Sequence, residues 1–255
     1  MNFCSLIAAI SILTWNTARM GGFEKPEKNE VLQYLLQQDA DVICLQEVDV
    51  YKDARFLTLP EVKKALSTKY PYSYLDFSVY DKRHQFGTMV WAKYPLINKQ
   101  SIHYVTRGNL SNRCDMVVGK DTIRIFNNHL ESYSFTSEDF EDMDRMEAKW
   151  KRAIPLRNEQ ARVVRAEIEA SPYPVIVVGD FNSVALSYAY WHISRGLHDA
   201  WNAVHPWSWG ATYEYRGIGL RIDYILSSES LIPTACFVSS FHGSDHKPVT
   251  ATLEL

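Results

Sequence analysis

Polar residues stand beside short apolar runs at six places in the 255-residue sequence. They are Asn16, Glu47, Asn128-His129, Asp180-Phe181-Asn182, Asp223 and Asp245-His246. Carboxylates, amides and histidines are the groups with which proteins bind ligands and move protons. Because the loops at strand ends of an α/β sheet converge on ligands, this pattern predicts that the six places form one site.

Each place taken alone has an ordinary structural interpretation. A carboxylate after a strand is often a helix cap, and Asp180 and Asn182 could shape a turn. A histidine beside an aspartate, as at His246, is commonly a surface pair. Asp223 is harder to explain in this way, because a carboxylate between apolar neighbours is costly to bury unless it is paired, and a histidine elsewhere in the chain is a natural partner. The joint pattern favours the common site.

The elements that would position these residues alternate between strands and helices. Apolar runs of strand length predict strands near residues 11–15, 41–45, 86–92, 122–127, 175–178, 221–226 and 249–253. Helical spacing covers residues 29–38 and 137–170, with Pro155 as a break in the second helix. No repeat or long linker divides the chain, so we expect one α/β domain over residues 1–255 with two packed sheets.

The segment of residues 137–165 changes its charge along its length. Its first part is acidic, and its second part carries Lys149, Lys151, Arg152 and further arginines. A solvated helical face is the ordinary interpretation. The alternative is a lid over the site, because the segment follows His129 closely.

The composition excludes several classes of protein. A hydrophobic content of 46% excludes a disordered or fibrous chain. Lys and Arg number 27 against 30 Asp and Glu, and this net charge of -3 does not favour nucleic acid as a partner held by bulk charge. The four cysteines, Cys4, Cys44, Cys114 and Cys236, form no CxxC pair, so we expect buried thiols and no zinc site or disulfide framework.

The amino-terminal segment of residues 1–11 is apolar. No Lys or Arg precedes Arg19, so the basic region of a signal peptide is missing, and the apolar run is too short to span a bilayer. We expect part of it to form a buried first strand. The sequence leaves two locations open for this soluble domain: the cytoplasm, or a membrane to which a preceding segment of a longer chain attaches it.

Six motifs occur in an order that resembles a known superfamily. They are Leu13-Thr14-Trp15-Asn16, Cys44-Leu45-Gln46-Glu47, Asn128-His129-Leu130, Gly179-Asp180-Phe181-Asn182, Arg221-Ile222-Asp223-Tyr224 and Gly243-Ser244-Asp245-His246-Lys247-Pro248. The sequence resembles the endonuclease/exonuclease/phosphatase superfamily, the group of DNase I and the abasic-site endonucleases, and in particular its uncharacterised bacterial members. The resemblance covers residues 12–255 and implies a four-layered α/β sandwich: two packed, mostly antiparallel sheets flanked by helices, with the site at their rim.

The resemblance also implies a cation site. Glu47 would be the principal ligand of Mg²⁺, with Mn²⁺ as an alternative ion, and Asn16 and Asp245 would complete its shell or hydrogen-bond to it. One firm carboxylate is adequate, because Mg²⁺ keeps several waters and binds substrate phosphate oxygens. The chain departs from DNA-processing members at Ala18, where they often carry an acidic residue. A second metal is therefore in doubt.

The remaining motif residues would carry out the reaction. The resemblance implies that His246 is the general base that activates water, oriented by Asp223. Asp180 would manage a proton near the nucleophile or leaving group, and Asn182 and His129 would donate hydrogen bonds to the phosphate. Hydrolysis of a phosphate ester needs these parts: an in-line water, a cation on the non-bridging oxygens and donors around them.

We therefore expect a Mg²⁺-dependent hydrolase of phosphate esters. One alternative is a metal-dependent endonuclease or exonuclease on DNA or RNA, and another is a non-catalytic binding module on the same fold. The sequence indicates a phosphate-ester substrate and no obligate protein partner.

Overall fold

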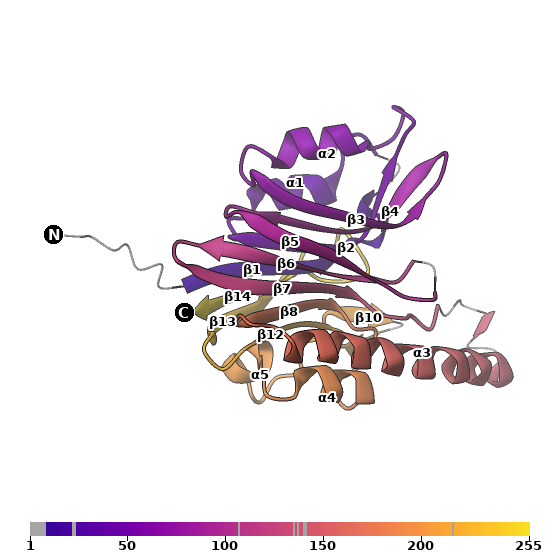
Figure 1. Ribbon diagram of the computed structural model, residues 1–255. Coiled ribbons are helices and arrows are strands. Elements are labelled where there is room, and N and C mark those ends of the chain that lie inside the picture. The colour runs from indigo at the N-terminus through magenta and orange to yellow at the C-terminus, as the bar shows by residue number, and fades with distance from the viewer. Residues whose placement is uncertain are drawn as a thin grey trace.

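The computed structural model describes residues 9–21, 24–106, 108–134, 136, 138–139, 142–215 and 217–255. Two six-stranded sheets pack face to face, and helices cover their outer faces, so the chain forms four layers (Figure 1). The predicted fold class is confirmed. The predicted strand near residue 11 also begins earlier, at Ala9, whereas residues 1–8 lie outside the described part.

The first sheet contains the strands that carry the Asn16 and Glu47 motifs. Its order is β13 (Ile232–Val238), β14 (Val249–Glu254), β1 (Ala9–Asn16), β2 (Val42–Tyr51), β4 (His84–Ala92) and β3 (Tyr72–Tyr80). β1 is parallel to β2, and the other neighbours are antiparallel. The turn η1 (Ala18–Gly21) follows β1, and α1 (Glu30–Gln37) and α2 (Leu59–Leu66) lie outside this sheet (Figure 1).

The second sheet carries the other strand-end motifs. Its order is β5 (Leu96–His103), β6 (Leu110–Val118), β7 (Asp121–His129), β8 (Val175–Asp180), β12 (Asp223–Ser227) and β9 (His198–Asp199). β7 is parallel to β8, and the other neighbours are antiparallel. Outside it lie α3 (Met143–Glu169) and α4 (Tyr188–Ser194), whereas α5 (Ala200–Val204) packs against β12 and β13 at the edge of the layer between the sheets, and a hairpin of β10 (Tyr213–Tyr215) and β11 (Ile218–Leu220) precedes β12.

Alternation of side chains along the strands produces three apolar layers. In β1, Ile10 and Ile12 point into the layer between the sheets, whereas Leu13 and Trp15 belong to the layer beneath α1 and α2. In β8, Val177 belongs to the layer beneath α3 and α4. Because a strand exposes successive residues on opposite faces, a continuous apolar run is what a strand buried on both faces requires.

The predicted long helix begins later than expected and does not break. α3 starts at Met143, where Asp142 caps it by accepting hydrogen bonds from the backbone amides of Asp144 and Arg145, and it continues through Pro155 to Glu169. The predicted break at Pro155 is therefore wrong. Pro155 is exposed, and buried Ala153 and Arg157 on either side of it keep both halves of the helix against the body. Of the acidic first part, residues 137, 140 and 141 lie outside the described residues.

Two further expectations concern cysteines and membranes. Cys44, Cys114 and Cys236 are buried and unpaired, as predicted, and Cys4 lies outside the described residues. In the part of the chain that the structure describes, no helix is both long and apolar enough to cross a membrane.

Replacing Gly179 by alanine is expected to destabilise the fold strongly. Gly179 has a φ of 127°, and an added Cβ would lie 2.0 Å from the carbonyl oxygen of Asn128 on β7. We expect the free energy of unfolding in urea to fall by about 3 kcal/mol or more. Gly196→Ala is the control, because Gly196 has a φ of 73° with no atom within 4 Å of an added Cβ. It should lose only the conformational cost of about 1 kcal/mol, and equal losses would contradict the steric explanation.

Candidate active site

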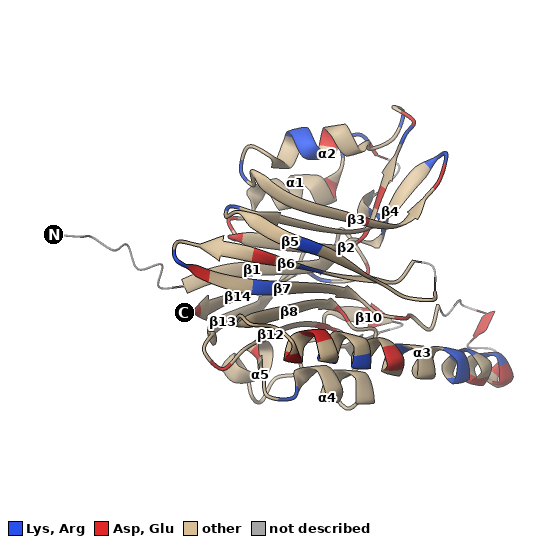
Figure 2. Ribbon diagram, viewed as in Figure 1, with Lys and Arg blue, Asp and Glu red and all other residues tan. Residues whose placement is uncertain are grey.

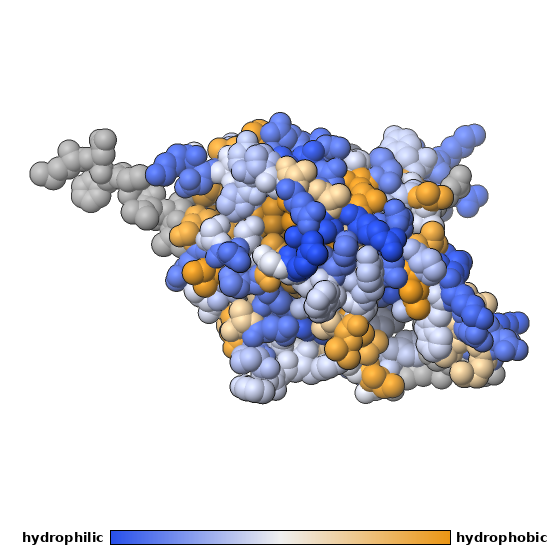
Figure 3. Space-filling view, turned by 60° about the horizontal axis from the view of Figure 1, so that its bottom comes forward, coloured by the Kyte–Doolittle hydropathy of each residue, from blue (hydrophilic) through white to orange (hydrophobic). Residues whose placement is uncertain are grey.

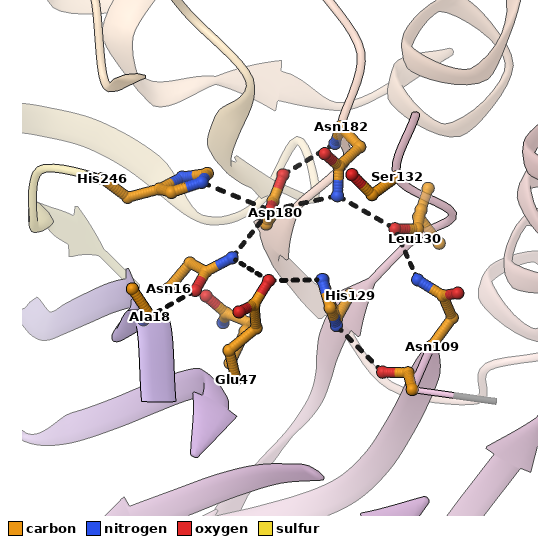
Figure 4. A network of polar contacts seen from close by, with 12 residues as sticks. Asn16, Ala18, Glu47, Asn109, His129, Leu130, Ser132, Asp180, Asn182 and His246 are labelled. Carbon is orange, nitrogen blue, oxygen red and sulfur yellow. Dashed lines mark hydrogen bonds and ion pairs between the residues drawn. The ribbon is translucent and has the colours of Figure 1, made fainter. Parts of the chain in front are cut away.

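The six predicted places come together at one rim of the two sheets, and Figure 4 shows five of them, with Asp223 joined to the site through His246. Asn16, His129 and Asp180 are the last residues of β1, β7 and β8, and His129 and Asp180 are direct partners in the register of the parallel pair. Asp223 is the first residue of β12, and because β12 is antiparallel to β8 it stands opposite Asp180. Strand direction therefore places all of these side chains at the same end.

Glu47 reaches the site by a different route from the predicted one. The sequence places it after a strand that ends near Leu45, but β2 continues to Tyr51. The pairing of β2 with β4 shifts between Leu45 and Val48, and Glu47 has a φ of 50° within this bulge. The bulge turns the carboxylate toward the second sheet, which a regular strand would not do.

Asn16 links the two carboxylates nearest to it. Its Nδ2 donates to Glu47 Oε1 at 3.1 Å and to Asp180 Oδ2 at 2.9 Å (Figure 4). Its Oδ1 accepts from the backbone amide of Ala18 at 3.1 Å. Asn16 is thus hydrogen-bonded to Glu47, the predicted principal ligand of the cation.

His129 is buried next to Glu47. Its Nε2 lies 3.3 Å from Glu47 Oε1, and its Nδ1 lies 3.2 Å from the carbonyl oxygen of Gly108. Burial alone would raise the pKa of Glu47, but the hydrogen bond and charge of His129 and the hydrogen bond of Asn16 lower it to about 2. Burial likewise opposes the charge on His129, and Glu47 outweighs it, so the pKa of His129 is raised.

Asp180 and Asn182 form a tight turn after β8. The backbone amide of Asn182 donates to Asp180 Oδ1 at 2.7 Å, and its Nδ2 donates to Asp180 Oδ2 at 3.1 Å. The same Nδ2 donates to the carbonyl of Leu130 at 3.0 Å, which also accepts from Asn109 at 2.9 Å. Asn182 has a φ of 49°, a conformation that asparagine tolerates better than most residues.

His246 and Asp223 form the buried pair that the sequence predicts. His246 Nδ1 lies 2.9 Å from Asp223 Oδ2, and His246 Nε2 lies 3.7 Å from Asp180 Oδ2. The ring of Tyr213 lies against the imidazole, with centroids 4.8 Å apart. Burial alone would lower the pKa of His246, but the charges of Asp223 and Asp180 raise it to about 10. Burial raises the pKa of Asp223 in spite of the charge on His246.

Two overlapping sets of side chains could hold a metal ion. Glu47, His129 and Asp180 form one set, and Asp180, Asp223 and His246 form the other, each with donor atoms within 4.8 Å of one another. Carboxylate oxygens are the ligands that Mg²⁺ prefers, so Glu47 and Asp180 fit such an ion. Asp245 is exposed, and among the described residues it belongs to neither set, although its charge helps to raise the pKa of His246.

A pocket of about 410 Å³ adjoins the side chains that could hold a metal ion. Glu47 and His129 lie on its wall, together with Arg19, Phe86, Thr106, Gly108, Asn109, Glu131, Ser132, Ser134 and Arg152. Sequence reasoning missed Asn109 and Glu131. Glu131 stands two residues after His129, and this proximity to a strand end is a signal that could have identified it.

Residues 137–165 were predicted to form either a solvated helical face or a lid. α3 packs against the second sheet through Ala161, Val164 and Ile168, so most of it is a layer of the fold. Arg152 lines the pocket. The helix therefore contributes one wall to the site, and its outer face is solvated.

The family model of the endonuclease/exonuclease/phosphatase family matches residues 13–246. The chain belongs to the endonuclease/exonuclease/phosphatase family. Members of this family are hydrolases of phosphate esters, including nucleic acids, and generally depend on divalent metals. The chain is thus an enzyme of the metal-dependent phosphoesterase class, as the sequence predicts.

Similar proteins in this family differ widely in name. An exodeoxyribonuclease of Bacillus subtilis is 25% identical over 96% of this chain and 100% of its own length. An endonuclease/exonuclease/phosphatase structure from Beutenbergia cavernae has a TM-score of 0.76 at 17% identity, and the match covers 97% of this chain and 72% of that one. Sphingomyelinase C from Streptomyces griseocarneus has a TM-score of 0.66 at 18% identity, with 96% and 99% covered. These structures share the fold.

The affinity of the site formed by Glu47 and Asp180 for Mg²⁺ is expected to increase with pH. With its pKa at about 10, His246 is charged at neutral pH, and a cation bound at Asp180 competes with that proton. If one proton leaves per cation, affinity rises by up to about tenfold per pH unit between about pH 7 and 9. Calorimetry in buffers of different ionisation enthalpy measures the released proton. His103→Ala, at an exposed histidine of β5, is the control, and an affinity independent of pH would contradict the competition.

Proposed function

We propose that the enzyme is a Mg²⁺-dependent phosphodiesterase of compact phosphate esters that uses direct attack by water. The observation that carries the proposal is the convergence of the His246–Asp223 pair and the Glu47–Asp180 carboxylates at one rim. Water attacks in line, so no covalent nucleophile is needed. We also propose that residues 1–255 form a single domain, whose six motifs span residues 12–255.

The cation is assigned to Glu47 and Asp180. The two carboxylates share the amide of Asn16, which orients both of them. Mg²⁺ supplies positive charge to the non-bridging oxygens of the phosphate, and Mn²⁺ is the alternative ion. Asp245 is exposed beside His246 and is assigned to the outer shell of the ion.

The proton transfer is assigned to His246. Asp223 holds Nδ1 at 2.9 Å, so Nε2 is the atom that takes a proton from water, and it does so in the neutral form of the ring. Asp180 Oδ2 lies 3.7 Å from this Nε2. It is assigned to the handling of a proton near the nucleophile or leaving group.

Asn182 and His129 are assigned to binding of the phosphate. The amide of Asn182 is neutral and does not repel phosphate. His129 has a raised pKa, and its Nε2 faces Glu47 at the edge of the pocket. The N–H group at Nε2 can therefore donate its hydrogen bond to a phosphate oxygen instead of the carboxylate. Charge-assisted donors of this kind stabilise the charge that redistributes in the transition state.

The distribution of charged side chains and the size of the pocket favour a compact substrate. Lys and Arg are interspersed with Asp and Glu along α2 and α3 (Figure 2). The described side chains on the face of Figure 3 form small hydrophobic groups between hydrophilic ones, so this face offers no broad apolar surface. A pocket of about 410 Å³ accommodates a small molecule.

A nuclease is the second candidate. The relative from Bacillus subtilis, which matches over 96% of the chain, is named an exodeoxyribonuclease. The two candidates differ in their expected response to salt, because proteins that neutralise many phosphates lose affinity steeply as salt rises.

We expect a compact phosphodiester to be hydrolysed more efficiently than duplex DNA, with a shallow dependence of kcat/KM on salt. The measurement is a salt series on bis-p-nitrophenyl phosphate and on duplex DNA with one enzyme preparation, with and without Mg²⁺. Efficient duplex cleavage with a steep salt slope would replace this proposal by the nuclease. No metal-dependent turnover of any phosphate ester would favour the binding module.

A further inference from the structure

The turn after β1 holds one arginine against the pocket. Ala18, Arg19 and Met20 have φ of 42°, 69° and 56°, so three consecutive residues are left-handed. The amide of Ala18 donates to Asn16 Oδ1, the side chain of Met20 is fully buried, and the carbonyl of Met20 accepts from Asn29. The backbone at Arg19 is therefore fixed by the loop that also carries Asn16.

The guanidinium of Arg19 differs from that of Arg152, which also lines the pocket. Arg152 donates to Glu131 Oε1 at 2.6 Å and to the carbonyl of Ser132 at 3.3 Å, so a carboxylate compensates its charge. Arg19 is exposed and forms no ion pair with the residues that the structure describes. Within the described part of the pocket, Arg19 is the arginine whose charge is available to a ligand.

The pocket continues directly from the cation site, because Glu47 and His129 belong to both. We propose that Arg19 is a specificity-determining residue that binds a second phosphate group of the substrate, beside the phosphate that is hydrolysed. The inference rests on the proposed function, which places the scissile phosphate at Glu47 and His129. A guanidinium forms paired, charge-assisted hydrogen bonds to phosphate oxygens, which suits this role better than contact with a neutral group.

The remaining pocket wall suits the group that joins the two phosphates. Phe86 provides an aromatic surface, and Thr106, Asn109, Ser132 and Ser134 provide hydroxyl and amide groups. A sugar with an attached ring system presents both kinds of surface. The substrate class is therefore a nucleotide-like phosphodiester with a neighbouring phosphate.

The test compares two phosphodiesters that differ by one phosphate: thymidine 5′-(p-nitrophenyl phosphate) and its 3′-phosphorylated form. Both release p-nitrophenol from the same bond. We expect the parent enzyme with Mg²⁺ to prefer the 3′-phosphorylated compound in kcat/KM. Arg19→Gln should reduce this preference by about 10- to 100-fold, mainly through KM, since binding to a remote group acts on both the ground state and the transition state.

Arg195→Gln is the matched control. Arg195 is exposed and pairs with Glu169, which ends α3 just before β8 begins, so it lies at the opposite end of the sheet from the site. This variant should keep the parent preference. Circular dichroism checks that both variants are folded.

Two results would overturn the assignment of Arg19. Equal losses of kcat/KM on the two compounds, which leave the preference unchanged, would show that Arg19 contacts the scissile phosphate, and an unchanged kcat/KM on both compounds would show that it binds no phosphate. If the parent enzyme hydrolyses neither compound, the proposed function fails, and the inference fails with it.

The second phosphate could belong to a compact nucleotide or to the next nucleotide of a single strand. A single-stranded oligonucleotide with the same 5′-terminal p-nitrophenyl ester distinguishes these sources. A kcat/KM no higher than that of the 3′-phosphorylated compound identifies the compact source, and a higher value identifies the strand. In both cases the proposed subsite requires that Arg19→Gln lowers kcat/KM on the compound with the second phosphate.

Discussion

Glu47→Gln is expected to abolish most of the hydrolytic activity and to raise the Mg²⁺ concentration that the remainder requires. The change keeps the size of the side chain but removes a carboxylate whose pKa of about 2 keeps it charged. It also removes the negative partner of His129 at 3.3 Å. Because hard cations bind carboxylates far better than amides, the loss should be about 100-fold or more in kcat/KM at fixed Mg²⁺.

The measurement is a Mg²⁺ titration of hydrolysis by parent and variant. Glu254→Gln, at the exposed end of β14, is the control and should titrate like the parent. A Glu47→Gln variant with an unchanged Mg²⁺ requirement would mean that another residue is the principal ligand.

The second large effect is expected at the histidine that faces Asp180. His246→Ala should lower kcat by about 100- to 10,000-fold, the range for a general base. Asp223→Asn should also lower kcat, because the asparagine neither fixes the tautomer nor stabilises the charged ring. The loss should be smaller than that of His246→Ala, because the asparagine keeps the volume at Nδ1 and the histidine remains in place. Both side chains are buried at a contact of 2.9 Å.

The double variant decides whether the two residues act as a unit. We expect its kcat to fall little below that of His246→Ala, because Asp223 acts through the histidine. Thermal unfolding of all three variants separates loss of activity from loss of fold. Additive losses in kcat would assign Asp223 to the fold or to another partner.

Strand ends explain why much of the site could be predicted from the sequence. Asn16 and Asp180 end runs in which apolar residues predominate, as in strands buried on both faces, and His129 ends a strand in which Ile123 and Ile125 alternate with other residues. Parallel pairing then brings the ends together. Asp223 was recognisable because a lone carboxylate between apolar residues requires a partner.

Other features depend on contacts that a local pattern does not contain. The bulge at Glu47 is set by the shifted pairing of β2 with β4, between residues about 40 positions apart in sequence. The helix passes through Pro155 because of packing on both sides, which overrides the local preference. In β3, β5 and β6 polar residues interrupt the apolar ones, and β13 contains Pro233 and Thr234, so these strands lack the apolar runs that predicted β1, β2 and β8.

Each sheet contributes half of the site through one parallel strand pair whose strands are joined across a helix. β1 and β2, connected through α1, present Asn16 and Glu47, whereas β7 and β8, connected through α3, present His129 and Asp180. An ion held by Glu47 and Asp180 would therefore link the β1–α1–β2 unit to the β7–α3–β8 unit, which are separate in sequence. Bound cation should slow hydrogen exchange in the strands of both units at once, and a fragment containing either unit alone should show no such protection.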